Sequence, residues 1–194
     1  MDTLFPVEPR FPEGFCYYED FISLAEEQQL LNAISKTELH TFRFQGYEAK
    51  RKVASFGYDW SFENRTLTKG KEIPEEFQSI IQKVATLISL PPDAVAELLV
   101  TEYPAGSVIN WHRDAPPFDL IAGISLLSDY TFRLRPYDKT KQKRGSIISF
   151  TAKQRSLYIM QSVARTEWEH SIAPVKQVRY SITLRTLREK SGNQ

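Results

Sequence analysis

The sequence has almost no cysteine and very little histidine. Its one cysteine, Cys16, cannot form a disulfide within the chain and cannot by itself build a thiolate metal site, which suits a reducing compartment. The only histidines are His40, His112 and His170, so any histidine-based metal site must be drawn from these three. Chemistry that needs a cluster of cysteines is excluded.

Long hydrophobic runs and a strong excess of one charge are also absent. No apolar stretch approaches the roughly 18 residues that a membrane helix requires, and the proline-rich start of the chain lacks the apolar core of a secretory signal. The net charge is +1, far from the strongly basic balance of a dedicated nucleic-acid scaffold, although a local basic rim can still surround a pocket. We expect a soluble protein in the cytoplasm, associated with the nucleoid in a bacterium or nuclear in a eukaryote.

The first half of the chain predicts two helices within what we interpret as a single domain of 194 residues. Ser23 and Glu26 form a capping-box pattern ahead of apolar residues at helical spacing, which predicts a helix over about 23–36. A second helix is expected from Pro74 to just before Pro91, because proline favours a first turn and one apolar stripe follows.

The rest of the chain predicts short strands. Between the helices an aromatic-rich stretch alternates around expected turns at Gly46 and Gly57. In the second half, strands are expected at about 97–103, 107–112, 120–127, 130–136, 145–151, 156–161, 167–172 and 177–186. Helices followed by strands indicate an α+β, mostly β fold, an antiparallel sandwich or barrel with the helices on one outer face.

Two of the histidines lie where a metal site could form. His112 and Asp114 are two residues apart, so an extended chain directs both side chains to one face, and His170 belongs to a separate predicted strand. Two imidazoles and one carboxylate are typical of non-haem Fe(II) oxygenases, and zinc hydrolases use a related set. A His-x-Asp pair alone is a weak signal, since such pairs are common on protein surfaces. His40 has no partner at metal spacing.

A cationic strand near the C-terminus strengthens the iron interpretation. In RYSITLR, Arg179, Ser181, Thr183 and Arg185 share one face, while apolar side chains share the other. The alternative is an exposed edge strand with two solvated arginines. An iron site that uses a dianionic 2-oxo acid would explain both motifs, because the acid's distal carboxylate needs a cation, and the planar fork of arginine suits that contact.

These motifs resemble those of the AlkB family of Fe(II)- and 2-oxoglutarate-dependent dioxygenases, of bacterial type. The resemblance rests on TEYPAGSVINWHRD, WEHSI and RYSITLR, which together span about 99–186, with looser matches in EDFISLAEEQQLLNAI and GYEAKRKVASFGYDW. It implies a double-stranded β-helix (jelly-roll) core over 97–188, preceded over 1–96 by helices packed on one face and a nucleotide-recognition lid.

The resemblance also assigns roles to individual residues. It implies that His112, Asp114 and His170 bind Fe(II), the site at which 2-oxoglutarate and O2 also bind. Arg179 and Tyr103 are expected to hold the distal carboxylate of 2-oxoglutarate, and Arg185 is expected near its metal-chelating end. Thr101 and Ser181 stand where the family usually has asparagine, so both are candidate 2-oxoglutarate contacts with a shorter reach.

The implied activity is oxidative demethylation of alkylated bases such as 1-methyladenine or 3-methylcytosine in DNA or RNA, releasing formaldehyde, succinate and CO2. We expect a monomer that acts on single-stranded nucleic acid and not at a membrane. One alternative is a hydroxylase or demethylase of a protein or small molecule on the same scaffold. Another is a binding module that has lost turnover, against which the complete triad and both arginines argue.

Candidate substrate contacts are aromatic and basic. A base bound in a pocket stacks on aromatic walls, and phosphates need cations, but each such aromatic residue is equally suited to a core. The candidates are Phe56, Tyr58, Trp60 and Trp168 for the wall, and Arg51, flanked by Lys50 and Lys52, for phosphates. A further basic run, Lys139, Lys141, Lys143 and Arg144, predicts a solvated turn, with tracking of a nucleic-acid strand as the alternative.

Overall fold

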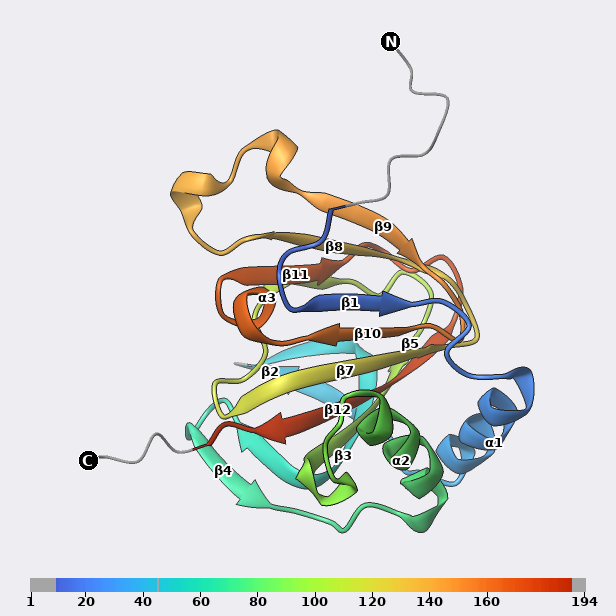
Figure 1. Cartoon of the computed structure of the whole chain (residues 1–194). Helices are drawn as coiled ribbons and strands as arrows, with labels where there is room; N and C mark the ends of the chain where they lie inside the picture. The colour runs from blue at the N-terminus through green and yellow to red at the C-terminus, as the bar shows by residue number, and fades with distance from the viewer. Residues whose placement is uncertain (1–9, 45, 190–194) are drawn as a thin grey trace.

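Two antiparallel sheets form the molecule, which we describe from a computed structural model over residues 10–44 and 46–189 (Figure 1). The larger sheet has the order β1 (Phe15–Tyr18), β10 (Leu157–Met160), β7 (Phe118–Leu126), β12 (Arg179–Leu187), β5 (Val95–Tyr103), β3 (Tyr47–Ser61) and β2 (His40–Phe44), with β4 (Thr66–Lys69) paired to β3. The smaller sheet has the order β6 (Ile109–His112), β11 (Trp168–Ile172), β8 (Tyr130–Pro136) and β9 (Ile148–Ala152). This mostly β jelly-roll architecture confirms the predicted fold class.

Helices α1 (Leu24–Ser35) and α2 (Gln78–Leu87) cover the outer face of the larger sheet (Figure 1). The capping box that begins α1 is formed, because the Ser23 hydroxyl accepts from the Glu26 amide at 3.2 Å and the Glu26 carboxylate accepts from the Ser23 amide at 2.7 Å. The remaining helical segments are α3 (Ser162–Thr166) and 3-10 turns at Glu75–Phe77, Pro92–Ala94, Lys139–Lys141 and Arg144–Ser146. No helix in the described part of the chain is long and apolar enough to cross a membrane.

Strand β12 separates two cores. Ile182 and Leu184 belong to the cluster beneath the helices, whereas Arg179 and Arg185 point between the two sheets, where they contact residues of the second cluster. Strict alternation along the strand therefore places the apolar face against α1 and α2 and the cationic face in the interior of the jelly roll, as the sequence pattern predicts.

The expected turn at Gly57 is wrong. β3 runs through this position as one 15-residue strand, with Gly57 at φ +83° as a kink. The Gly57 amide donates to the carbonyl of Lys71 at 2.6 Å, its carbonyl accepts from Gly70 at 2.7 Å, and a Cβ would lie 2.2 Å from the carbonyl oxygen of Ala96. Glycine is required here because β3 leaves one partner strand and joins another.

Three short elements were not predicted. β1 and β4 have four residues each and pair with β10 and β3, and α3 has five residues between β10 and β11. The segment expected to form the lid, GYEAKRKVASFGYDW, supplies most of β3, which pairs with β2 at one edge of the larger sheet.

Candidate metal centre and anion site

Three side chains, two from the smaller sheet and one from the loop after β6, converge between the two sheets. His112 ends β6, His170 lies in β11 as its register partner, and Asp114 follows in the loop after β6. The imidazole centroids are 4.3 Å apart, and one ligand atom from each of the three residues lies within 4.8 Å of the others. The strand pairing thus brings together the two histidines, which are 58 positions apart in the sequence.

The hydrogen bonds around these residues leave the right atoms free for a metal. His112 Nδ1 lies 2.8 Å from the carbonyl of Asn110, which leaves Nε2 as the ligand atom. Asp114 Oδ1 accepts from Arg185 at 2.6 Å, while Oδ2 is buried without a partner among the described residues and lies 3.7 Å from His170 Nε2. Two imidazole nitrogens and one carboxylate oxygen that lie this close together fit the three protein ligands of an Fe(II) facial triad.

The protonation states also suit metal binding. Burial, and next the neighbouring His112, lower the pKa of His170 to about 3, so its imidazole is neutral at pH 7. Burial would raise the pKa of Asp114, but Arg185, the two histidines and Arg165 outweigh it and hold the pKa well below its usual range. A neutral imidazole and an ionised carboxylate are the forms that bind a metal.

Arg185 connects the triad to a residue that the sequence did not single out. Its guanidinium donates to Asp114 Oδ1 and to Glu97 Oε2, each at 2.6 Å, and Glu97 also accepts from Ser55 at 3.0 Å. Glu97 is 3% exposed and faces the interior from β5, opposite Arg185. Arg185 was expected near the chelating end of 2-oxoglutarate, and it lies at the metal ligand itself.

A second missed residue holds the loop that carries Asp114. The buried Arg165 of α3 donates to the carbonyls of Asp114, Ala115 and Phe118 at 3.2, 2.8 and 2.9 Å. One guanidinium nitrogen thus replaces the backbone partners that this irregular loop lacks. Nothing in the local pattern around Arg165 indicated this role, because its partners lie about 50 positions away in the sequence.

Arg179 is buried in surroundings suited to an anion. It is 1% exposed, and its guanidinium is 4.5 Å from the ring centroid of Tyr103 and 3.7 Å from that of Tyr130. One nitrogen donates to Ser125 Oγ at 3.3 Å, whereas Nε and Nη1 are buried without partners among the described residues. Burial raises the pKa of Tyr130, which stays neutral. A buried cation with two free donors is suited to bind an anionic group such as a carboxylate.

The other expected co-substrate contacts share this interior face. Tyr103 is the register partner of Arg179, and Thr101 is the register partner of Ser181, so all four lie on neighbouring rungs of β5 and β12. Thr101 and Ser181 are both buried. The same ladder continues to the Arg185–Glu97 rung, so it leads from Arg179 to the residues that contact the metal ligand Asp114.

One expected substrate contact, Phe56, lies away from the metal residues. Its ring packs against Phe77, 6.3 Å away, in the cluster beneath the helices, on the opposite face of the larger sheet from the triad. The assignment of Phe56 to the wall of a base pocket is therefore wrong, because the pleat of β3 turns its side chain away from the metal residues.

Two of the remaining expected contacts, Trp168 and Trp60, pack against the inter-sheet cluster. Trp168 is two residues before His170, on the same face of β11, and Trp60 packs at the edge of the inter-sheet cluster. Arg51 stacks on Phe42 at 4.0 Å, and burial lowers its pKa, with Tyr103 acting in the opposite direction. Tyr58 instead helps to line a broad surface hollow that shares no residue with the triad.

Comparison with known proteins agrees with this geometry. The chain matches the 2OG-Fe(II) oxygenase superfamily over residues 14–188. It is 28% identical over 201 residues to the tRNA (carboxymethyluridine(34)-5-O)-methyltransferase alkbh8 of Xenopus tropicalis, covering 96% of this chain and 30% of that protein. It is 27% identical over 180 residues to the Alkylated DNA repair protein ALKBH8 homolog of Arabidopsis thaliana, covering 82% and 50%. The chain thus spans half or less of the length of these relatives.

Solved structures show the same fold at low sequence identity. OsALKBH1 superposes with a TM-score of 0.73 at 14% identity, covering 91% of this chain and 98% of that one. A prolyl hydroxylase from Trichoplax adhaerens superposes with a TM-score of 0.63 at 18% identity, covering 90% and 83%. The expected bacterial type has no support, since the two sequence relatives named above come from a frog and a plant. The chain belongs to the 2OG-Fe(II) oxygenase superfamily and is an AlkB-like dioxygenase that depends on Fe(II) and 2-oxoglutarate.

Proposed function

We propose that this dioxygenase removes methyl groups from alkylated bases, such as 1-methyladenine and 3-methylcytosine, in single-stranded DNA or RNA. The observation that supports the oxidative chemistry is the buried Arg179, which has two donors without partners among the described residues. Arg179 lies on the same strand as Arg185, which donates to Asp114. The nucleic-acid substrate is supported by the names of relatives, which refer to tRNA modification and to repair of alkylated DNA.

The residues of the site would form three groups with different roles. His112, Asp114 and His170 would hold Fe(II), which together with 2-oxoglutarate and O2 would supply the oxidation of the N-methyl carbon. Arg179 and Tyr103 would bind the distal carboxylate of 2-oxoglutarate, with Thr101 and Ser181 along its length. Arg185 would keep the free oxygen of Asp114 turned to the metal by bonding the other oxygen.

The substrate base would enter beside the triad. Trp168 and Trp60 would offer aromatic surface for stacking, and Tyr58 would contact the strand farther out. Arg51, half-buried beside Phe42, would meet a phosphate or the base itself. Once hydroxylated, the methyl group leaves as formaldehyde because the N-hydroxymethyl product breaks its carbon–nitrogen bond, and the base is restored.

The test is turnover with both products measured. The protein is loaded with Fe(II) without oxygen, then exposed to air with 2-oxoglutarate and a short oligonucleotide containing 1-methyladenine. We expect succinate and formaldehyde in equal amounts, and neither from the His112→Ala variant. Succinate without formaldehyde would redirect the search to a protein or small-molecule substrate. Absence of both products would contradict the assignment of the metal residues.

A further inference from the structure

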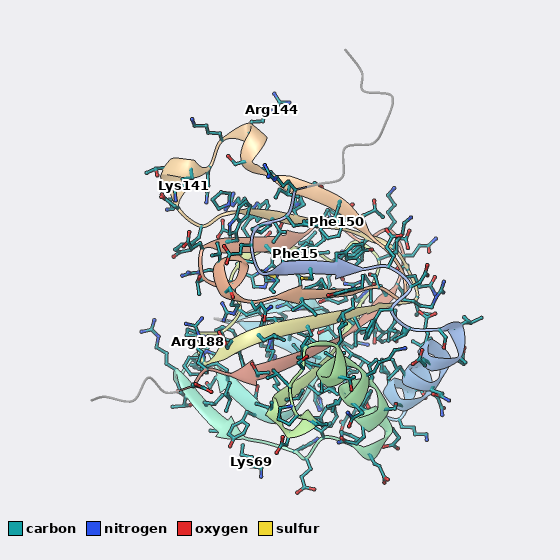
Figure 2. All side chains as sticks on the ribbon, viewed as in Figure 1. Phe15, Lys69, Lys141, Arg144, Phe150 and Arg188 are labelled. Carbon is teal, nitrogen blue, oxygen red and sulfur yellow. The ribbon has the colours of Figure 1, made fainter. Side chains whose placement is uncertain are left out.

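A projecting loop between β8 and β9 gathers four of the exposed cations. Lys139, Lys141, Lys143 and Arg144 all point to solvent, and Figure 2 shows Lys141 and Arg144 reaching away from the sheets. The one carboxylate within the loop, Asp138, is 4.0 Å from Lys141 and bonds mainly to Thr140. Such a weak, exposed ion pair leaves most of the loop's positive charge uncompensated.

The shape of this loop is fixed although its lysines are exposed. The Gln142 side chain donates to the carbonyl of Pro136 at 2.9 Å, and the Ser146 hydroxyl donates to the carbonyl of Lys141 at 2.8 Å. At its base, the Tyr137 amide donates to the carbonyl of Glu167 at 2.7 Å. The loop is thereby attached to the residue before Trp168, at the start of the strand that carries His170.

Three arginines continue the positive charge along the outer face of the smaller sheet. Arg135 and Arg133 lie 4.3 and 5.2 Å from the ring centroid of Trp111, and Arg113 lies 3.6 Å from that of Tyr137. Arg113 and Trp111 flank the metal ligand His112 in the sequence, so their side chains turn outward where the histidine turns inward.

These arginines are held in place but only partly neutralised. Arg135 pairs with Glu169, whereas no carboxylate lies within ion-pair distance of Arg113 or Arg133 in the part of the chain that the structure describes. Arg113 donates to the carbonyl of Thr166 at 2.9 Å. A guanidinium fixed over an aromatic ring loses little freedom when it binds a phosphate, which favours binding.

We define the basic face as the four loop cations with the three arginines: Arg113, Arg133, Arg135, Lys139, Lys141, Lys143 and Arg144. Seven cations stand there against the carboxylates of Asp138, Glu167 and Glu169, in a chain whose net charge is only +1. The rest of the molecule is therefore net negative. Such a separation of charge directs a polyanion to one face.

We propose that the basic face binds the phosphodiester backbone of the single-stranded nucleic acid on one side of the base that enters the iron site. The proposal rests on the proposed function and adds to it a path for the strand, from Trp168 past Arg113 and Tyr137 to the loop. Cations with interleaved aromatic rings are typical of such tracks.

The experiment measures binding of an unmodified 20-nucleotide strand by fluorescence anisotropy over a range of salt concentrations. The variant Lys141→Ala/Arg144→Ala removes two loop cations, and Lys36→Ala/Lys83→Ala removes two from the distant helices as a matched control. We expect the loop variant to bind roughly tenfold more weakly, with a slope of log affinity against log salt that is smaller by about 1.4, as for two lost phosphate contacts. The control should bind as wild type.

A second measurement separates this proposal from the proposed function. Turnover of a single methylated nucleotide, which has no strand to reach the loop, should be the same in wild type and the loop variant. Equal strand affinity in the loop variant, or no binding of any strand at low salt, would overturn the basic face and would favour an acidic protein partner. Loop-dependent strand binding without formaldehyde release would sustain the basic face and reject base demethylation.

Discussion

Two buried arginines on β12 differ in what they contact. Arg185 is bonded to Asp114 and Glu97, whereas Arg179 has two donors without partners among the described residues. The sequence predicted both residues as candidate contacts because both lie on one face of a strand. It could not separate their tasks, because the partners of Arg185 come from β5 and from the loop after β6.

The Glu97–Arg185 pair yields a prediction at this scale. Glu97→Gln keeps the shape of the side chain but leaves the charge of Arg185 less compensated beside Asp114, so binding of Fe(II) should weaken by up to about tenfold. Burial already raises the pKa of Glu97, so a neutral side chain should be tolerated by the fold.

The measurement is anaerobic titration of the apo protein with Fe(II), with thermal unfolding as a check on the fold. Glu102→Gln is the matched control, because Glu102 lies on the same strand but its carboxylate is 4.0 Å from Lys52, away from the triad. Equal Fe(II) affinity in Glu97→Gln and wild type would show that Glu97 does not act on the metal site.

Among the elements, the strands were predicted mainly from the turn residues that separate them. Strands after Pro92 were expected within three residues of their observed bounds, because proline, glycine and lysine-rich turns separate them. β1, β4 and α3 escaped notice because each is short, and β1 is stabilised by its pairing with β10, far away in the sequence. Gly57 was misjudged because a glycine marks either a turn or a kink within a strand.

Gly57 and Gly46 provide a matched test of that kink. Both have positive φ, at +83° and +79°, but a Cβ on Gly57 would meet the Ala96 carbonyl at 2.2 Å, whereas a Cβ on Gly46 would meet nothing within 4 Å. Gly46→Ala should cost about 1 kcal/mol of unfolding free energy from backbone strain alone. Gly57→Ala should cost about 3 kcal/mol, because a steric clash adds to the strain.

Chemical denaturation of the two variants would measure the difference. A similar cost for both would mean that β3 can shift away from β5 at Gly57. Since β3 carries Arg51 and Trp60, such a shift would also weaken their assignment to the substrate site.

At the scale of the whole molecule, the sequence predicted the fold class and the metal residues but not how the sheets meet. Alternation along β12 indicated one apolar and one cationic face, and the structure places the helices on the first and the triad by the second. The error over Phe56 arose at this scale, because an aromatic residue in a strand gives no sign of which core receives it. Glu97 and Arg165 were missed because their hydrogen-bond partners lie far away in the sequence.

We propose above that Arg179 anchors 2-oxoglutarate in the site that the triad completes. The most direct measurement is anaerobic calorimetric titration of 2-oxoglutarate into the Fe(II)-loaded protein, comparing wild type with Arg179→Met and with Arg144→Met as a surface control. We predict one equivalent bound by wild type and control, and affinity lower by about tenfold or more for Arg179→Met with Fe(II) binding retained. Equal 2-oxoglutarate affinity in all three proteins would show that Arg179 does not bind 2-oxoglutarate.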